Sequence, residues 1–131
     1  ALPMRGVLID IAIHEKQPDQ VLRWYDMKPE DAVGAGRMDQ VAEAVMEFAP
    51  DRAVALWKRL AEWEISKVQP SAYEAAAGYL RKLSGLWSKQ GRQAEWKTYL
   101  EGLRDVHRKK RRLMDVLNTL EEGPIVKPPR R

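Results

Sequence analysis

Asp10 and His14 are the first residues whose types and spacing suggest chemistry. They lie four positions apart, so a helix would place both on one face, and a carboxylate and an imidazole are both metal ligands. No third ligand follows at a suitable spacing, and no second histidine stands four positions after His14, as a zinc-protease motif requires. The chain has no cysteine, which excludes disulfides and Cys-based zinc sites. We therefore expect no metal site and interpret His14 as a helix-end histidine beside a carboxylate.

The serines and glycines form no catalytic motif that we recognise. Ser71 is followed three residues later by Glu74, the spacing of a capping box at the start of a helix. Gly34 and Gly36 lack the spacing and the preceding strand of a phosphate-binding loop. We expect no catalytic residue, no cofactor and no enzymatic activity.

The strongest functional signal is a basic segment near the C-terminus. Residues 1–103 carry a net charge of −1, whereas residues 104–131 carry +5. The cations that carry this signal are Arg104, Arg108, Lys109, Lys110, Arg111 and Arg112. Such asymmetry predicts an anionic partner, DNA or RNA included. The alternative is a solvated helix end whose charge has no partner.

Helical periodicity organises the rest of the chain. Apolar residues recur at spacings of three and four, and Pro and Gly separate the runs. The predicted helices span residues 4–16, 18–28, 37–49, 51–68, 70–90 and 92–120, with a loop at 29–36. The first is apolar on nearly every side, so we expect it to be buried between neighbours. The last contains no Pro, so we predict one long helix on which Arg104, Arg108 and either Arg111 or Arg112 share a face.

A degenerate internal repeat indicates how these helices are arranged. Residues 16–25 align with residues 48–57 at an offset of 32, and residues 89–96 follow at a further 41. Periods of this length are typical of two-helix repeats, which must stack to bury their apolar faces. We predict an all-α fold of three antiparallel helix pairs, stacked as a short α-solenoid like those of tetratricopeptide (TPR-like) or armadillo repeats. A closed helical bundle is the alternative.

The aromatic side chains fit this prediction. Most lie within helices at packing spacings, where large rings fill the gaps between layers. The functional alternative is a stacking surface for nucleotide bases. Trp63 and Tyr79 lie off the main apolar stripes and are the candidates for exposed aromatics.

Several segments resemble the C-terminal helical region of bacterial SWIM zinc-finger proteins. The likeness covers most of residues 5–117, and its segments are LIDIAIHEK at 8–16, DRAVALWKRL at 51–60, AYEAA at 72–76, YLRKL at 79–83, GRQAEWKTYL at 91–100 and HRKKRRLM at 107–114. The family's zinc motif requires Cys and His ligands, and this chain has no Cys. The resemblance therefore carries no metal or DNA role to any residue here, and it implies a helical interaction scaffold.

Together these observations predict one helical-repeat domain over residues 1–120 and a Pro-rich, basic, extended tail over 121–131. We expect a non-catalytic, cytoplasmic module, part of a larger protein, that binds another protein. The alternative is a nucleic-acid-binding accessory module that uses the basic segment between Arg104 and Arg112. No apolar run approaches the roughly 18 residues needed to span a bilayer, so we expect no membrane partner. The sequence does not indicate the oligomeric state.

Overall fold

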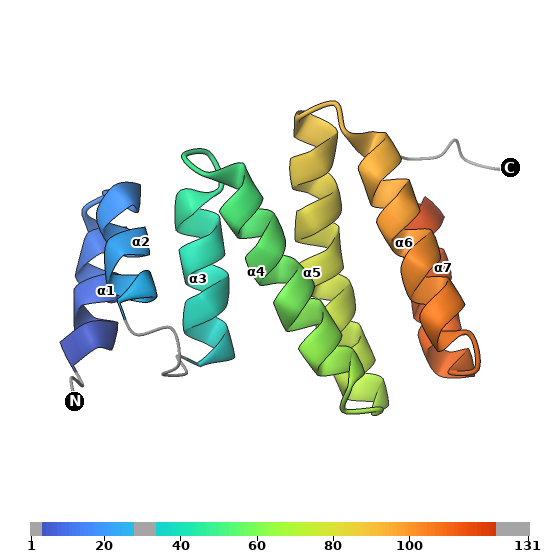
Figure 1. Ribbon diagram of the computed structural model, residues 1–131. Helices are drawn as coiled ribbons and strands as arrows, with labels where there is room; N and C mark the ends of the chain where they lie inside the picture. Colours follow the sequence, from blue (N-terminus) through green and yellow to red (C-terminus); the bar gives the residue numbers. More distant parts are fainter. Residues whose placement is uncertain (1–3, 28–33, 123–131) are drawn as a thin grey trace, which may run out of the picture. The chain divides into compact units, whose positions relative to one another are not determined.

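The computed structural model describes residues 4–27 and 34–122 of the chain (Figure 1). These residues form α-helices joined by turns, without a β-strand in the described ranges. The all-α prediction is therefore confirmed. The chain divides into two compact units, residues 1–60 and 61–131.

The first unit contains α1 (Met4–His14), α2 (Pro18–Asp26), α3 (Ala35–Val45) and most of α4 (Pro50–Ile65). Helix α1 packs against both α2 and α3, and α2 also packs against α3. The largest side chains of this unit that are less than 2% exposed are Ile9, Val21, Val41, Val45, Trp57 and Leu60. Val41 with Val45 and Trp57 with Leu60 stand four and three residues apart, which is the helical spacing from which these helices were predicted.

Polar side chains also join helices within this unit. The guanidinium of Arg37 on α3 donates from Nε to Asp10 Oδ1 at 3.0 Å and from Nη2 to Oδ2 at 2.8 Å. Arg52 on α4 binds Asp26 at the end of α2 in the same two-pronged way, at 3.0 and 2.6 Å. Trp57 Nε1 donates to Asp39 Oδ1 at 2.9 Å, which satisfies the polar atom of a buried ring.

The second unit contains the last turn of α4 together with α5 (Pro70–Lys89), α6 (Gln93–His107) and α7 (Arg111–Glu122). Helices α5, α6 and α7 pack against one another in all three pairings. The side chains that fill the space between them and are at most 3% exposed include Leu80, Leu83, Trp87, Leu100, Leu113 and Leu117.

The two ends of α5 differ in how well they follow prediction. Gly91 has a φ of +71°, and the Arg92 N–H donates to the Trp87 carbonyl at 2.8 Å. This is the left-handed helix end that glycine favours. At the other end the capping-box prediction is wrong. With Ser71 as the N-cap the helix would begin at Ala72, but α5 begins at Pro70, and the side chain of its N-cap residue Gln69 makes no capping hydrogen bond. Ser71 thus lies inside the first turn.

The prediction of one long C-terminal helix is also wrong. Helix α6 ends at His107, and α7 begins at Arg111 after a tight turn in which Lys110 N donates to the His107 carbonyl at 2.8 Å. In Figure 1 the chain reverses at this turn, and α7 runs back along α6. The reversal buries Leu113, Leu117 and Leu120, which are at most 5% exposed, whereas a straight extension would leave them in water. Arg104, Arg108 and Arg111 therefore do not share the face of a continuous helix.

Two further expectations are corrected. Helix α1 is not buried on all sides, because Val7 and Ile11 are 50% and 47% exposed. Helix α7 extends through Glu122, so the first two residues of the predicted tail are helical. The rest of that tail and most of the predicted loop at 29–36 lie outside the described residues.

Candidate functional site

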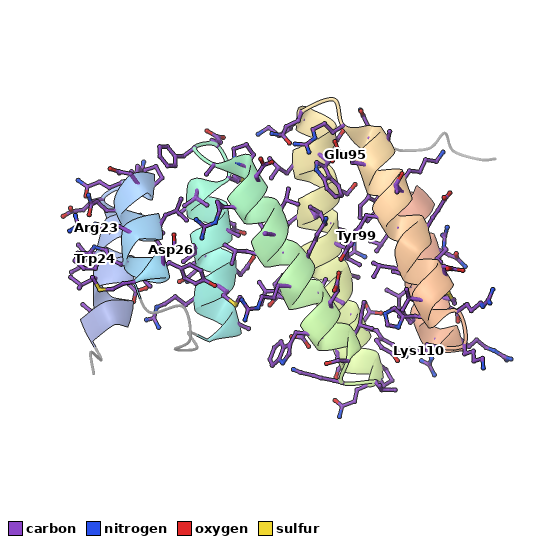
Figure 2. All side chains as sticks on the ribbon, in the orientation of Figure 1. Arg23, Trp24, Asp26, Glu95, Tyr99 and Lys110 are labelled. Atoms are coloured by element: carbon purple, nitrogen blue, oxygen red, sulfur yellow. The ribbon has the colours of Figure 1, made fainter. Side chains whose placement is uncertain are left out.

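The predicted basic segment lies at the turn between α6 and α7. We call residues 108–112 the basic turn; its cations are Arg108, Lys109, Lys110, Arg111 and Arg112. All are exposed except Lys110, which is half-buried, and Figure 2 labels Lys110 at this turn. The first three residues connect the helices, and the last two open α7. The reversal of the chain therefore gathers these charges at one end of the second unit.

None of these five cations forms an ion pair with another residue of the described ranges. Arg104, the sixth predicted cation, has a different environment. Its Nη2 donates to Asn118 Oδ1 at 3.0 Å, which ties α6 to α7 one turn away from the reversal. The structure thus separates Arg104 from the other five.

The start of α7 adds to the positive character of the turn. Its first turn contains Arg111 and Arg112 but no acidic residue. The N-terminus of a helix carries a partial positive charge and unsatisfied backbone N–H groups, so carboxylates are favoured there and cations are not. The residue types at this position are therefore the opposite of those that would stabilise the helix.

His107, the last residue of α6, lies beside this turn. Burial and the nearby charge of Lys110 lower the pKa of His107, while the Glu62 carboxylate opposes them and raises it. The Nδ1 atom of His107 is buried and makes no hydrogen bond within the described part of the chain. Its environment thus favours the neutral imidazole over the charged form.

Helix α6 is anchored about two turns before the reversal. Tyr99 donates its hydroxyl hydrogen to Glu62 Oε2 at 2.5 Å, and its ring meets that of Trp87 edge-on with 6.1 Å between centroids. Burial, and then the hydrogen bond to Glu62, raise the pKa of Tyr99 well above its ordinary value. Figure 2 shows Tyr99 on α6. These contacts fix the helix that carries the basic turn.

The first unit contains a groove, which the sequence did not reveal. Its volume is about 1010 Å³, and residues of α1, α2, α3 and the turn between α1 and α2 line it. We call it the α1–α3 groove. Its polar lining comprises Asp10, His14, Lys16, Gln17, Arg37, Gln40 and Glu43, and its apolar lining includes Ala12, Ile13, Val21 and Ala44.

The Asp10–Arg37 ion pair lies in the lining of this groove. The Arg37 guanidinium holds the pKa of Asp10 below its ordinary value, chiefly through the two hydrogen bonds. Gly6 makes room for this arrangement, because a Cβ there would lie 2.9 Å from Arg37 Cζ. The two residues singled out for chemistry, Asp10 and His14, both line the groove, and Asp10 binds an arginine. Within the described residues no cluster of three or more His, Cys, Asp or Glu side chains could hold a metal ion.

The two aromatic residues expected to be exposed differ in the structure. Trp63 is 50% exposed near the end of α4, and Lys67 Nζ lies 4.0 Å from its ring centroid. Lys67 also binds Glu64 at 3.1 Å. Tyr79, on α5, is half-buried, and it also interacts with other residues of the fold. Of the two, Trp63 is the more accessible ring.

Comparisons with known proteins provide no relative for this chain. No family model, curated protein or solved structure matches it. In the described ranges, no helix is both long and apolar enough to cross a lipid bilayer. The candidate sites therefore have to be interpreted from their own geometry.

Proposed function

We propose that the chain is a non-catalytic interaction module in which stacked helix pairs form a short solenoid that binds an extended segment of another protein in the α1–α3 groove. The groove itself carries this proposal. Three helices and a turn supply its lining, and both charged signs and two amide side chains, Gln17 and Gln40, are present.

The ion pairs of the first unit support the repeat arrangement. In a stack of two-helix repeats, the first helix of one pair lies beside the first helix of the next, and the second beside the second. Asp10 and Arg37 join α1 to α3, and Asp26 and Arg52 join α2 to α4. The pairs are 27 and 26 residues apart in sequence. Two equivalent bridges, one for each layer of helices, are what a TPR-like stack of α1–α2 on α3–α4 predicts.

The lining of the groove favours a peptide over a small molecule. Pockets for small ligands have mostly apolar and aromatic walls, whereas seven of the fourteen residues around this groove are charged, amide or imidazole side chains. An extended peptide offers backbone donors and acceptors for Gln17 and Gln40. Its side chains can cover the half-buried apolar residues of the lining, Ile13 and Ala44 among them. These features make a protein segment the ligand class that fits best.

Selection from a random peptide library tests the proposal. We expect enriched peptides to bind the purified chain, and binding to be lost in Ala44→Trp, which places an indole in the groove. The matched control is Ala55→Trp on the exposed side of α4, which adds the same bulk away from the groove and should retain binding. Both variants should keep the helical circular dichroism of the native chain.

The proposal fails if no peptide is enriched, or if Ala44→Trp and Ala55→Trp reduce binding equally. Equal loss would mean that the indole disturbs the chain in a general way and that the groove is not the binding surface.

A further inference from the structure

The basic turn is a second surface, in the other unit, and the groove proposal does not use it. It presents five consecutive cations, Arg108, Lys109, Lys110, Arg111 and Arg112, none of which has an ion-pair partner in the described ranges. Like charges so close together repel one another, and an external anion relieves this repulsion. Residues 4–27 and 34–122 therefore supply no ion-pair partner for the charges of the turn.

The position of the basic turn at the start of α7 adds a second unfavourable charge interaction. Arg111 and Arg112 occupy the first turn of α7, where no acidic residue balances the positive helix end. Anions bound at this end of the unit would reduce both the repulsion between neighbouring cations and the unfavourable helix-end charge. Such an arrangement suits several anionic groups spread over the turn better than one.

We propose that the basic turn binds the phosphate backbone of a nucleic acid without reading its base sequence. Three of the five cations are arginines, whose planar guanidinium groups form paired hydrogen bonds with phosphate oxygens. Nucleic-acid strands supply negative charges at close, regular intervals, which matches consecutive cations around a turn. This proposal concerns a different partner and a different unit from the groove proposal, so either proposal can fail while the other holds.

An anionic membrane fits the same surface less well. Membrane-surface helices insert an apolar face beside their cations. Here Leu113, Leu117 and Leu120 of α7 are at most 5% exposed. Val106 is 74% exposed beside the turn, but one valine is a small apolar anchor. The observations therefore favour a nucleic acid.

The turn is also held in place before any ligand arrives. The Arg104–Asn118 hydrogen bond ties α6 to α7, the Tyr99–Glu62 bond ties α6 to the end of α4, and Leu103 and Leu113 are buried on either side of the turn. Binding thus requires little ordering of this segment. For the same reason, exposed cations can be replaced without unfolding the unit.

Fluorescence anisotropy with labelled 20-nucleotide single-stranded RNA, duplex RNA and duplex DNA tests the proposal. At 50 mM salt we expect binding, and within each of the three kinds of nucleic acid the affinity should not depend on the base sequence. The affinity should fall steeply by 200 mM salt. In Arg108→Ala/Arg111→Ala, affinity at 50 mM should fall about tenfold or more, and the slope of log K against log salt should flatten by about 2 on duplexes, about 1 for each lost contact.

The control is Arg81→Ala/Lys97→Ala, which removes the same charge from exposed positions on α5 and α6 and should bind like the native chain. Vesicles containing phosphatidylserine form a parallel arm. The proposal is overturned by no binding at 50 mM salt, by equal losses in both double variants, or by binding to vesicles but to none of the three nucleic acids. None of these outcomes affects peptide binding in the α1–α3 groove.

Discussion

Arg37 on α3 donates two parallel hydrogen bonds, of 3.0 and 2.8 Å, to the carboxylate of Asp10 on α1, and both residues line the α1–α3 groove. The side chains remain 34% and 47% exposed, so solvent screens the pair. Its contribution to the free energy of unfolding should be on the order of 0.5 kcal/mol. The pair also joins α1 to α3, the two helices that supply most of the groove's lining.

The first prediction concerns the acid dependence of this pair. The folded-state pKa of Asp10 lies below its unfolded value, which is about 3.9. The stabilisation is therefore fully present above pH 4 and is lost as the pH falls through the folded pKa. Arg37→Gln should raise the pKa of Asp10 to its ordinary range and remove this component of the acid dependence. Carboxyl chemical shifts and urea unfolding at several pH values measure both. An unchanged Asp10 titration in Arg37→Gln would contradict the ion pair.

A second prediction uses Gly6 beneath the guanidinium. Gly6→Ala should displace Arg37, because the new Cβ would lie 2.9 Å from its Cζ and Nη1 atoms and the arginine end can move. Alanine favours the helix over glycine by up to about 1 kcal/mol at an interior position, and Gly6 lies in the first turn of α1, so a smaller gain should offset the weakened ion pair. We therefore expect a pKa of Asp10 closer to its ordinary value and little loss of stability. A substantially destabilised chain with an unchanged Asp10 titration would show that Arg37 does not lie over Gly6.

The sequence predicted elements well where one local pattern determined them. The apolar spacing of Val41, Ala42 and Val45 marked the buried face of α3, and Gly91 marked the end of α5. The reversal after His107 was missed because neither Pro nor Gly lies there. That turn depends on tertiary packing, since Leu113 and Leu117 are buried only when α7 folds back on its neighbours.

The two candidate sites also differ in how far the sequence predicted them. The cations of the basic turn were visible as a run of charge, and only their arrangement around a reversal required coordinates. The α1–α3 groove was not visible at all. Asp10 and Arg37 are 27 residues apart, and no periodicity within one helix links a carboxylate to an arginine on another helix.

A third prediction concerns His107. Its folded-state pKa is lowered by burial and by Lys110, and Glu62 partly offsets both. Between the folded pKa and the unfolded value of about 6.5, the unfolded chain binds more protons, so stability falls as the pH drops through this window. Imidazole proton shifts should show the pKa of His107 rising in Lys110→Gln and falling in Glu62→Gln. His14→Gln identifies the signals of the only other histidine. Shifts in the opposite directions would mean that these charges do not face the ring.

A fourth prediction separates stability from binding at the basic turn. In Arg111→Glu/Arg112→Glu the two acidic residues should stabilise the start of α7, by about 0.3–1 kcal/mol each, because they complement the helix end. The same variant should lose nucleic-acid binding. Thermal unfolding and anisotropy on one preparation provide both numbers. A lower melting temperature would contradict the placement of these residues in the first turn of α7.

The most direct test of the central claim, that the α1–α3 groove receives a protein segment, is a titration of the isotope-labelled chain with a selected peptide, followed through its backbone amide chemical shifts. The account predicts that the largest shifts fall on groove-lining residues of α1 and α3, Asp10 and Gln40 among them, and that residues of α5 and α7 change little. Largest shifts in the second unit, or small shifts spread over the whole chain, would contradict it.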